Sequence, residues 1–72
     1  MKPNVVKGTR IILGISQDDM AKELGIGSNN YAIKERGERE FSIPEMAAIA
    51  KKFGWGFDKV NEYFFDSIFP MM

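Results

Sequence analysis

Cysteine and histidine are both absent from this chain of 72 residues. Without cysteine, neither a disulfide nor thiolate chemistry can contribute to its stability or function. Without histidine, the chain lacks the commonest general base and the commonest metal ligand. We therefore expect a protein that is not an enzyme and that has no catalytic residue, no metal site and no cofactor.

Long hydrophobic runs are missing as well. No stretch approaches the roughly 18 consecutive apolar residues that a membrane-spanning helix needs. The residues after Lys2 do not form the apolar run of a signal peptide. These absences predict a cytoplasmic protein that does not bind a membrane.

An excess of charge of one sign is also missing. The chain has 10 basic and 10 acidic residues, so its formal net charge is zero, whereas a dedicated nucleic-acid-binding protein usually carries a basic excess. The distribution of the charges along the chain therefore matters more than their sum.

Apolar residues are plentiful, at 44% of the chain, and include six Phe, two Tyr and one Trp. They are sufficient for the compact core of one small domain. Gly, Ser and Pro divide the sequence into five short helical segments, and no segment alternates as a strand would, so the predicted fold class is all-α. The helices are expected over about 3–13, from Ser16 to Gly25, from Ser28 to just before Gly37, from Ser42 to Gly54, and after Gly56.

Two serines mark helix starts. Ser16 with Asp19, and Ser42 with Glu45, have the spacing of a capping box, in which the two side chains bond the first backbone amides of a helix. Apolar residues at helical spacing then indicate which residues share one face of each helix. These sets are Val6, Arg10 and Leu13; Met20, Ala21 and Leu24; Met46, Ile49, Ala50 and Phe53; and Phe57, Val60 and Phe64.

The second and third segments are each about eight residues long and are joined by the short turn Gly25-Ile26-Gly27. Two such helices and a glycine-containing turn are typical of a helix-turn-helix, here over about 17–36. Ala21 is small enough for the helices to approach closely, and Tyr31 can pack back from the third helix onto the second. A small helical bundle with tight turns that has no helix-turn-helix role would show the same pattern.

The chain resembles the Cro/CI-type (XRE-like) helix-turn-helix family of phage repressors and related bacterial regulators over roughly residues 5–65. The residues that carry the resemblance are Gly14-Ile15-Ser16-Gln17, Met20-Ala21, Leu24-Gly25-Ile26, Tyr31, Lys34-Glu35, Gly37, Phe41, Glu45, Ile49-Ala50, Gly54, Asp58 and Phe64-Phe65. It implies a compact five-helix domain of the lambda-repressor-like type over residues 1–65. It also implies that Arg10 and Glu35 pair as a structural clamp between the first and third helices.

The resemblance further implies that the third helix would lie in the DNA major groove. Ser28 and Asn29 would then meet base edges, while Gln17 and Asn30 would contact phosphates. Ser28, Asn29 and Asn30 also suit an ordinary helix start, because all three favour caps and turns. The complete surface predicted to recognise DNA or a partner consists of Gln17, Ser28, Asn29, Asn30, Ile33, Lys34, Arg36 and Arg39.

Two features of this surface depart from a DNA-binding pattern. Residues 16–41 hold the acids Asp18, Asp19, Glu23, Glu35, Glu38 and Glu40 but only the bases Lys22, Lys34, Arg36 and Arg39. Because phosphate neutralisation supplies most sequence-independent affinity, DNA binding should be weak. An exposed Ile33 on the same face could meet a thymine methyl, but it suits a protein surface at least as well.

Two functions follow as alternatives. The chain resembles small modulator-of-repression and Cro-like proteins of temperate phages of Gram-positive bacteria. It would then act in a lysis–lysogeny switch as an antirepressor that binds the cognate repressor and modulates its binding to operator DNA. The alternative is a Cro-like repressor that binds operator DNA directly, as a homodimer formed through the fifth helix and the tail. That apolar tail, residues 66–72 with Ile68 and Phe69, packs either on the domain or on a partner.

Overall fold

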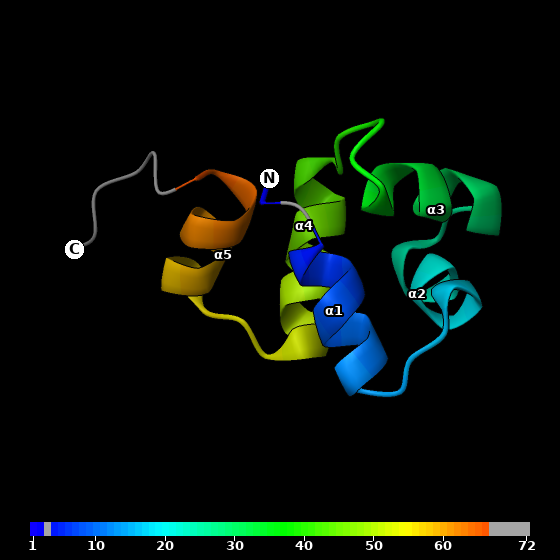
Figure 1. Cartoon of the computed structure of the whole chain (residues 1–72), viewed down its shortest axis with the longest axis horizontal. Helices are drawn as coiled ribbons and strands as arrows, with labels where there is room; N and C mark the ends of the chain where they lie inside the picture. The colour runs from blue at the N-terminus through cyan, green and yellow to red at the C-terminus, as the bar shows by residue number, and fades with distance from the viewer. Residues whose placement is uncertain (3, 67–72) are drawn as a thin grey trace.

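Five α-helices follow one another in the computed structural model, which describes residues 1–2 and 4–66 (Figure 1). They are α1 (Val5–Ile12), α2 (Gln17–Leu24), α3 (Ser28–Glu35), α4 (Ile43–Phe53) and α5 (Phe57–Phe64). No strand occurs within the described ranges, so the prediction of an all-helical fold with five helices is confirmed. Of the expected segments, Pro3 at the start of the first helix and residues 67–72 of the tail, with Ile68 and Phe69, lie outside the described residues.

The predicted caps define the ends of α2 and α4. At α2 only one half of the predicted capping box forms: the Ser16 hydroxyl accepts a hydrogen bond from the Asp19 amide at 3.0 Å, but the Asp19 carboxylate does not bond the Ser16 amide. At α4 the full capping box is present: the Ser42 hydroxyl accepts from the Glu45 amide, and the Glu45 carboxylate accepts from the Ser42 amide. Gly25 ends α2 with φ +71°, a left-handed conformation that glycine adopts without strain.

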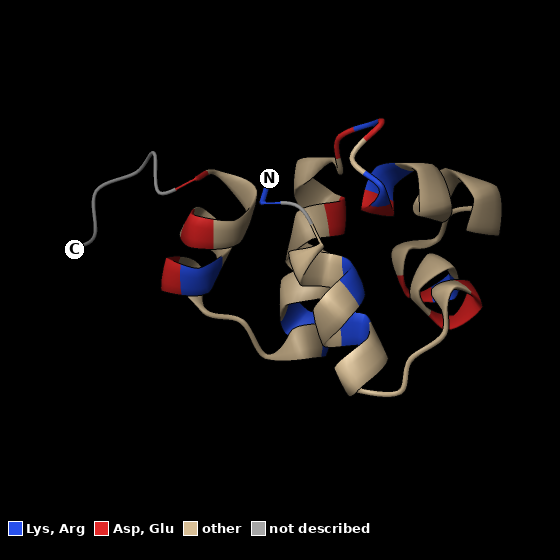
Figure 2. Ribbon diagram, viewed as in Figure 1, with Lys and Arg blue, Asp and Glu red and all other residues tan. Residues whose placement is uncertain are grey.

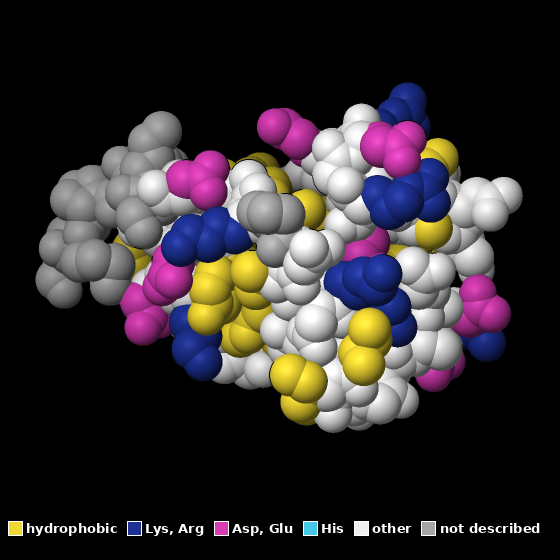
Figure 3. All heavy atoms as spheres, in the orientation of Figure 1, with side chains coloured by type: hydrophobic (Ala, Val, Ile, Leu, Met, Phe, Trp, Pro, Cys, Tyr) yellow, Lys and Arg dark blue, Asp and Glu magenta, His cyan; other side chains and the backbone are white. Residues whose placement is uncertain are grey.

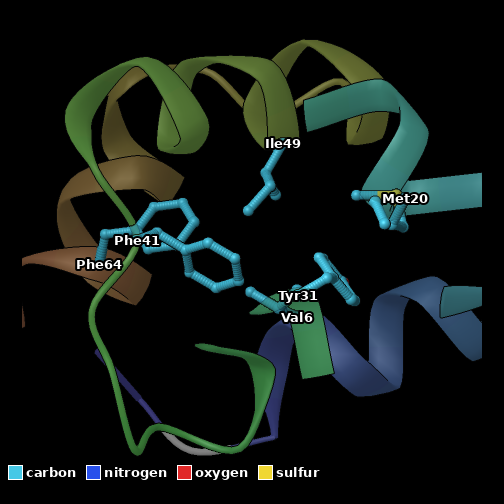
Figure 4. Packing of buried hydrophobic residues seen from close by; sticks show 7 residues of the cluster. Val6, Met20, Tyr31, Phe41, Ile49 and Phe64 are labelled. Atoms are coloured by element: carbon cyan, nitrogen blue, oxygen red, sulfur yellow. The ribbon is translucent and has the colours of Figure 1, made fainter. Parts of the chain in front are cut away.

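Along the longest axis of the molecule, α2 and α3 lie at one end and α5 at the other, with α1 and α4 between them (Figure 1). The core is shared by all of these elements. Its buried hydrophobic residues are Val6, Met20, Ala21, Tyr31, Phe41, Ile49 and Phe64. Figure 4 shows their side chains converging from the five helices and from the loop before α4. Burial of this apolar surface therefore fixes how α2 and α3 sit on the rest of the domain.

Aromatic rings extend this core toward α5. Phe41, which lies in the loop and not in a helix, packs with ring centroids 6.0 Å from Tyr31 and 6.2 Å from Phe64. Trp55, in the link between α4 and α5, packs at an angle against Tyr63, Phe53 and Phe64, with ring centroids 4.9, 5.1 and 5.9 Å away. The two ends of the molecule are thus joined through one continuous set of aromatic contacts.

Two residues predicted to share a helix face with buried residues are themselves exposed. Leu13 is 51% exposed because α1 ends at Ile12, so Leu13 follows the helix and does not continue the face of Val6 and Arg10. Phe57, the first residue of α5, is 57% exposed and lines an open hollow together with Ile43 and Ala47 of α4. Periodicity identifies which residues share a face but not where the packed part of that face ends.

Candidate binding surface

We use the name α2–α3 surface for the exposed parts of α2 and α3 together with the loop that follows them, residues 36–40. The turn between the helices is closed by two backbone bonds: the Gly25 amide donates to the Lys22 carbonyl and the Ile26 amide to the Ala21 carbonyl. Ile26 is half-buried against the core, so it anchors the turn. The start of α3 is therefore held at a fixed position beside α2.

A buried polar network ties this pair of helices to α1. Arg10 Nε donates to Glu35 Oε2 at 2.9 Å and Arg10 Nη2 to Glu35 Oε1 at 3.2 Å. The same carboxylate accepts from the Tyr31 hydroxyl at 2.6 Å and from Gln17 Nε2 at 3.0 Å. Arg10 Nη1 also donates to the Ile15 carbonyl at 2.8 Å. The structure thus places Arg10 and Glu35 as a clamp, and it adds Gln17 and Tyr31 to that clamp.

The ionisation of the clamp follows from these bonds. Burial alone would raise the pKa of Glu35, but hydrogen bonds from Arg10, Tyr31 and Gln17 together lower it below its ordinary value of 4.5. The hydrogen bond to Glu35 raises the pKa of Arg10. Burial, and then the hydrogen bond to Glu35, raises the pKa of the Tyr31 hydroxyl. The ion pair is therefore fully charged near neutral pH.

The predicted recognition residues divide by exposure. Ser28, Asn29, Asn30, Arg36 and Arg39 are exposed, whereas Gln17, Ile33 and Lys34 are half-buried. Two expectations need correction here. Ile33 does not stand exposed on the face of α3, because part of its side chain is covered by the fold. Lys34 turns toward α4, where its ammonium group lies 2.7 and 2.8 Å from the two carboxylate oxygens of Glu45.

Four of the predicted recognition residues donate to carboxylates of this same chain. The pairs are Gln17 with Glu35, Ser28 with Asp18, Lys34 with Glu45, and Arg36 with Glu38. The Ser28–Asp18 and Arg36–Glu38 bonds are both 2.6 Å long. Donors that are already bound to carboxylates offer less to a phosphate, because an existing charge-assisted bond must first be broken.

Asn29, Asn30 and Arg39 differ from these four. Within the described part of the chain, no side-chain hydrogen bond or ion pair involves any of the three. Figure 2 shows that α3 carries no charged residue until its last turns, whereas acidic and basic residues alternate along the loop that follows. In Figure 3 acidic and basic side chains lie next to one another at the end of the molecule formed by α3 and the loop that follows it. The exposed acids Asp19 and Glu40 have no such partner either.

A hollow of about 300 Å³ opens beside the loop. Phe41, Met46 and Phe64 contribute to its apolar lining, and Arg36 and Arg39 are among its polar lining residues. Because the loop lines it, the α2–α3 surface ends in a depression of mixed character, with Glu35 and Glu40 also among its polar lining residues. Such a depression suits an inserted side chain better than a flat base edge.

Sequence reasoning missed Asp18 and Glu45 as partners of the recognition residues. Glu45 was identified only as a helix cap, and its second role depends on Lys34, 11 positions earlier in the chain. Asp18 precedes Ser28 by 10 positions. Each pair joins two different helices, so only the fold brings these side chains together.

Comparisons with other proteins add no independent assignment: no family model, no curated protein and no solved structure matches the chain. Among residues 1–2 and 4–66, no group of acidic side chains could hold a metal ion. Over the same residues, no helix has both the length and the apolar character to cross a membrane. The candidate site is therefore defined by the geometry and charge of the α2–α3 surface.

Proposed function

We propose that α2 and α3 form a helix-turn-helix of the lambda-repressor-like type, and that the chain is a small phage-type regulator of transcription. In this proposal its α2–α3 surface binds the cognate repressor and modulates the binding of that repressor to its operator. The protein then acts as an antirepressor in a lysis–lysogeny switch. The shape of the two helices and the resemblance to small modulators of repression both support this role.

The observation that carries the proposal is the pairing of the recognition residues with carboxylates. Lys34 and Arg36, two of the four bases in residues 16–41, are neutralised by Glu45 and Glu38. Nonspecific affinity for DNA depends on how many phosphates a protein neutralises with Lys and Arg, so little affinity remains on this surface. A surface whose exposed acids outnumber its unpaired bases favours a basic partner over a polyanion.

A DNA-binding repressor is a partner of that chemistry, because it must itself carry a basic surface to contact phosphates. Asp19 and Glu40 are exposed and can pair with such a surface. The hollow beside the loop can accept an apolar side chain of the same partner. Charge complementarity would guide the encounter, and the apolar contact would hold the complex.

Fluorescence anisotropy on a labelled operator duplex tests this role, measured with this chain alone, with the repressor alone and with both. The expected result is weak binding by the chain alone and a change in repressor binding when it is added. Nanomolar binding of DNA by the chain alone, with a salt dependence that reflects several phosphate contacts, would refute the proposal. So would a repressor–operator affinity that is unchanged at a large excess of the chain.

A Cro-like operator-binding dimer is the second candidate, and one observation favours it. The side chains of Asn29 and Asn30 are exposed at the start of α3 without a partner in the described structure, and an asparagine amide can bond adenine through two hydrogen bonds. Phe57 and Ile43, 57% and 64% exposed, offer apolar surface near α5 for a second copy. Sedimentation equilibrium at micromolar concentration would detect that dimer.

A further inference from the structure

The carboxylate of Asp18 lies beside the start of α3. Asp18, the second residue of α2, accepts a hydrogen bond of 2.6 Å from the hydroxyl of Ser28, the first residue of α3. Both side chains are exposed. A full negative charge therefore lies at the place where, in a helix-turn-helix, the recognition helix first approaches the duplex.

Lys22, one turn further along α2, is the base nearest to this charge in the sequence. Asp18 forms no ion pair among those that the described residues make, whereas Glu23 on the same helix pairs with Lys52 at 3.3 Å. The contact with Ser28 is to a neutral hydroxyl, so the pair keeps its charge of −1. A phosphate placed near Asp18 would meet direct repulsion.

The same contact also occupies the Ser28 hydroxyl, which the resemblance to the helix-turn-helix family assigns to a base edge. As long as Ser28 donates to Asp18, it cannot donate to a base. The neighbouring Asn29 and Asn30 remain available, but they lie next to the carboxylate. DNA would thus be disfavoured by charge at α3 and would also lose one polar contact.

We propose that Asp18 is a specificity-determining residue that weakens the binding of duplex DNA to the α2–α3 surface through its negative charge. This rests on the proposed function, in which that surface selects a protein partner over DNA. Removal of the charge alone, without any change in shape, makes the start of α3 accessible to a phosphate backbone. The hydrogen bond to Ser28 holds the carboxylate in place, but it is the charge that discriminates.

The variants Asp18→Asn and Asp18→Ala separate the charge from the hydrogen bond. Asparagine keeps an acceptor oxygen for Ser28 and removes the charge, whereas alanine removes both. Asp58→Asn is the matched control, because Asp58 is an exposed residue in the first turn of α5 and the net charge changes by the same amount. In Figure 1, α5 lies at the end of the molecule opposite to α2 and α3.

The probe is a fluorescein-labelled 20-base-pair duplex of mixed sequence, titrated with the full chain at about 50 mM salt, where phosphate contacts are strongest. We expect Asp18→Asn and Asp18→Ala each to bind about fivefold more tightly than the wild type, since one repulsion of unit charges at about 4 Å in water is removed. Asp58→Asn should change the affinity less than twofold. Helical circular dichroism should show all four proteins equally folded.

Equal affinities for Asp18→Asn and Asp58→Asn would overturn the inference. A gain confined to Asp18→Ala would also overturn it, because release of Ser28 and not loss of charge would then be responsible. Should Asp18→Asn fail to fold, Asp18→Ala/Ser28→Ala is compared with Ser28→Ala instead, because the charge is then removed with no hydroxyl left to release. Tight binding of this duplex by the wild type would instead refute the proposed function. The ratio of the Asp18→Asn and Asp58→Asn affinities would still show whether the charge of Asp18 weakens DNA binding.

Discussion

The ammonium group of Lys34 lies between the two carboxylate oxygens of Glu45, at 2.7 and 2.8 Å, and so joins the last turn of α3 to the first turn of α4. Glu45 Oε1 also accepts from the Ser42 amide, so one side chain caps α4 and holds α3. Both partners are largely buried, with side-chain exposures of 15% and 11%. The loop of residues 36–40 is therefore anchored at both of its ends.

Removal of Lys34 should destabilise the protein because it leaves Glu45 as an unpaired charge in a covered position. We expect Lys34→Met to lower the free energy of unfolding by about 3 kcal/mol. The double variant Lys34→Met/Glu45→Gln should recover most of this loss, since no unpaired charge remains. Urea unfolding followed by circular dichroism measures both. Lys51→Met, the same change at an exposed position of α4, should stay within about 0.5 kcal/mol of the wild type; a similar loss there would argue against the ion pair as the cause.

Charge reversal in the loop of residues 36–40 should increase the affinity of the protein for DNA. Glu38→Lys/Glu40→Lys places two bases where two acids stand and releases Arg36 from its pair with Glu38. The slope of log affinity against log salt for a duplex should steepen by about 2, since each new phosphate contact contributes roughly 0.9. Binding to a basic partner should weaken by the same change.

The variant Asp58→Lys/Glu62→Lys on α5 controls for net charge, since it adds the same charge at the other end of the molecule. Anisotropy across a salt series compares the two double variants. If both steepen the slope equally, the effect belongs to the charge of the whole protein and not to the loop.

Stability should fall in acid through Glu35 and Glu45. Burial acts to raise the pKa of each, but hydrogen bonds from Arg10 to Glu35 and from Lys34 to Glu45 leave both pKa values below 4.5. A group with a lowered pKa in the folded state stabilises the protein fully above its unfolded value and loses this effect as the pH falls through the folded value. The free energy of unfolding should therefore be flat above pH 5 and decline below 4.5.

Glu45→Gln should make that decline shallower, because one of the two groups no longer titrates. Urea unfolding at several pH values between 3 and 6 compares the variant with the wild type. A parallel decline in the two proteins would exclude Glu45 as a source of the pH dependence.

Two glycines should respond in opposite directions to the same substitution. Gly25 ends α2 with φ +71°, so Gly25→Ala should cost about 1 kcal/mol although no atom lies within 4 Å of the added Cβ. Gly8 lies inside α1, and the space around it is equally open. Gly8→Ala should therefore stabilise the protein by about 0.5–1 kcal/mol. Thermal unfolding of both variants measures this; a loss in both would indicate that packing and not backbone conformation decides.

Local signals predicted the helices well because their ends are encoded by nearby residues. Ser16 and Ser42 begin helices through bonds to amides three positions away, and Gly25 and Gly54 end them in the left-handed conformation. These interactions lie within one turn of the chain, so the sequence pattern contains both partners.

The candidate site was less predictable because its contacts join distant elements. Sequence could place Ser28 on the recognition surface, but not show that its hydroxyl donates to Asp18. It likewise included Lys34 among the recognition residues, although the Lys34 side chain is bound to Glu45. The buried position of Phe41, in a loop without periodicity, could not be read from helical spacing. Tertiary contacts determine which side chains of a surface are free to bind a ligand, and a local sequence pattern does not contain these contacts.

Trp55 gives the junction of α4 and α5 an intrinsic fluorescence signal. It is the one tryptophan of the chain, and its ring contacts Phe53, Tyr63 and Phe64 at the junction of α4 and α5. Its emission therefore reports the environment of that junction, without any label. A ligand that covers α5 should shift the spectrum, whereas one that covers only the distant surface of α2 and α3 should leave it unchanged. The chain thus contains its own fluorophore for deciding which of its two ends a bound molecule occupies.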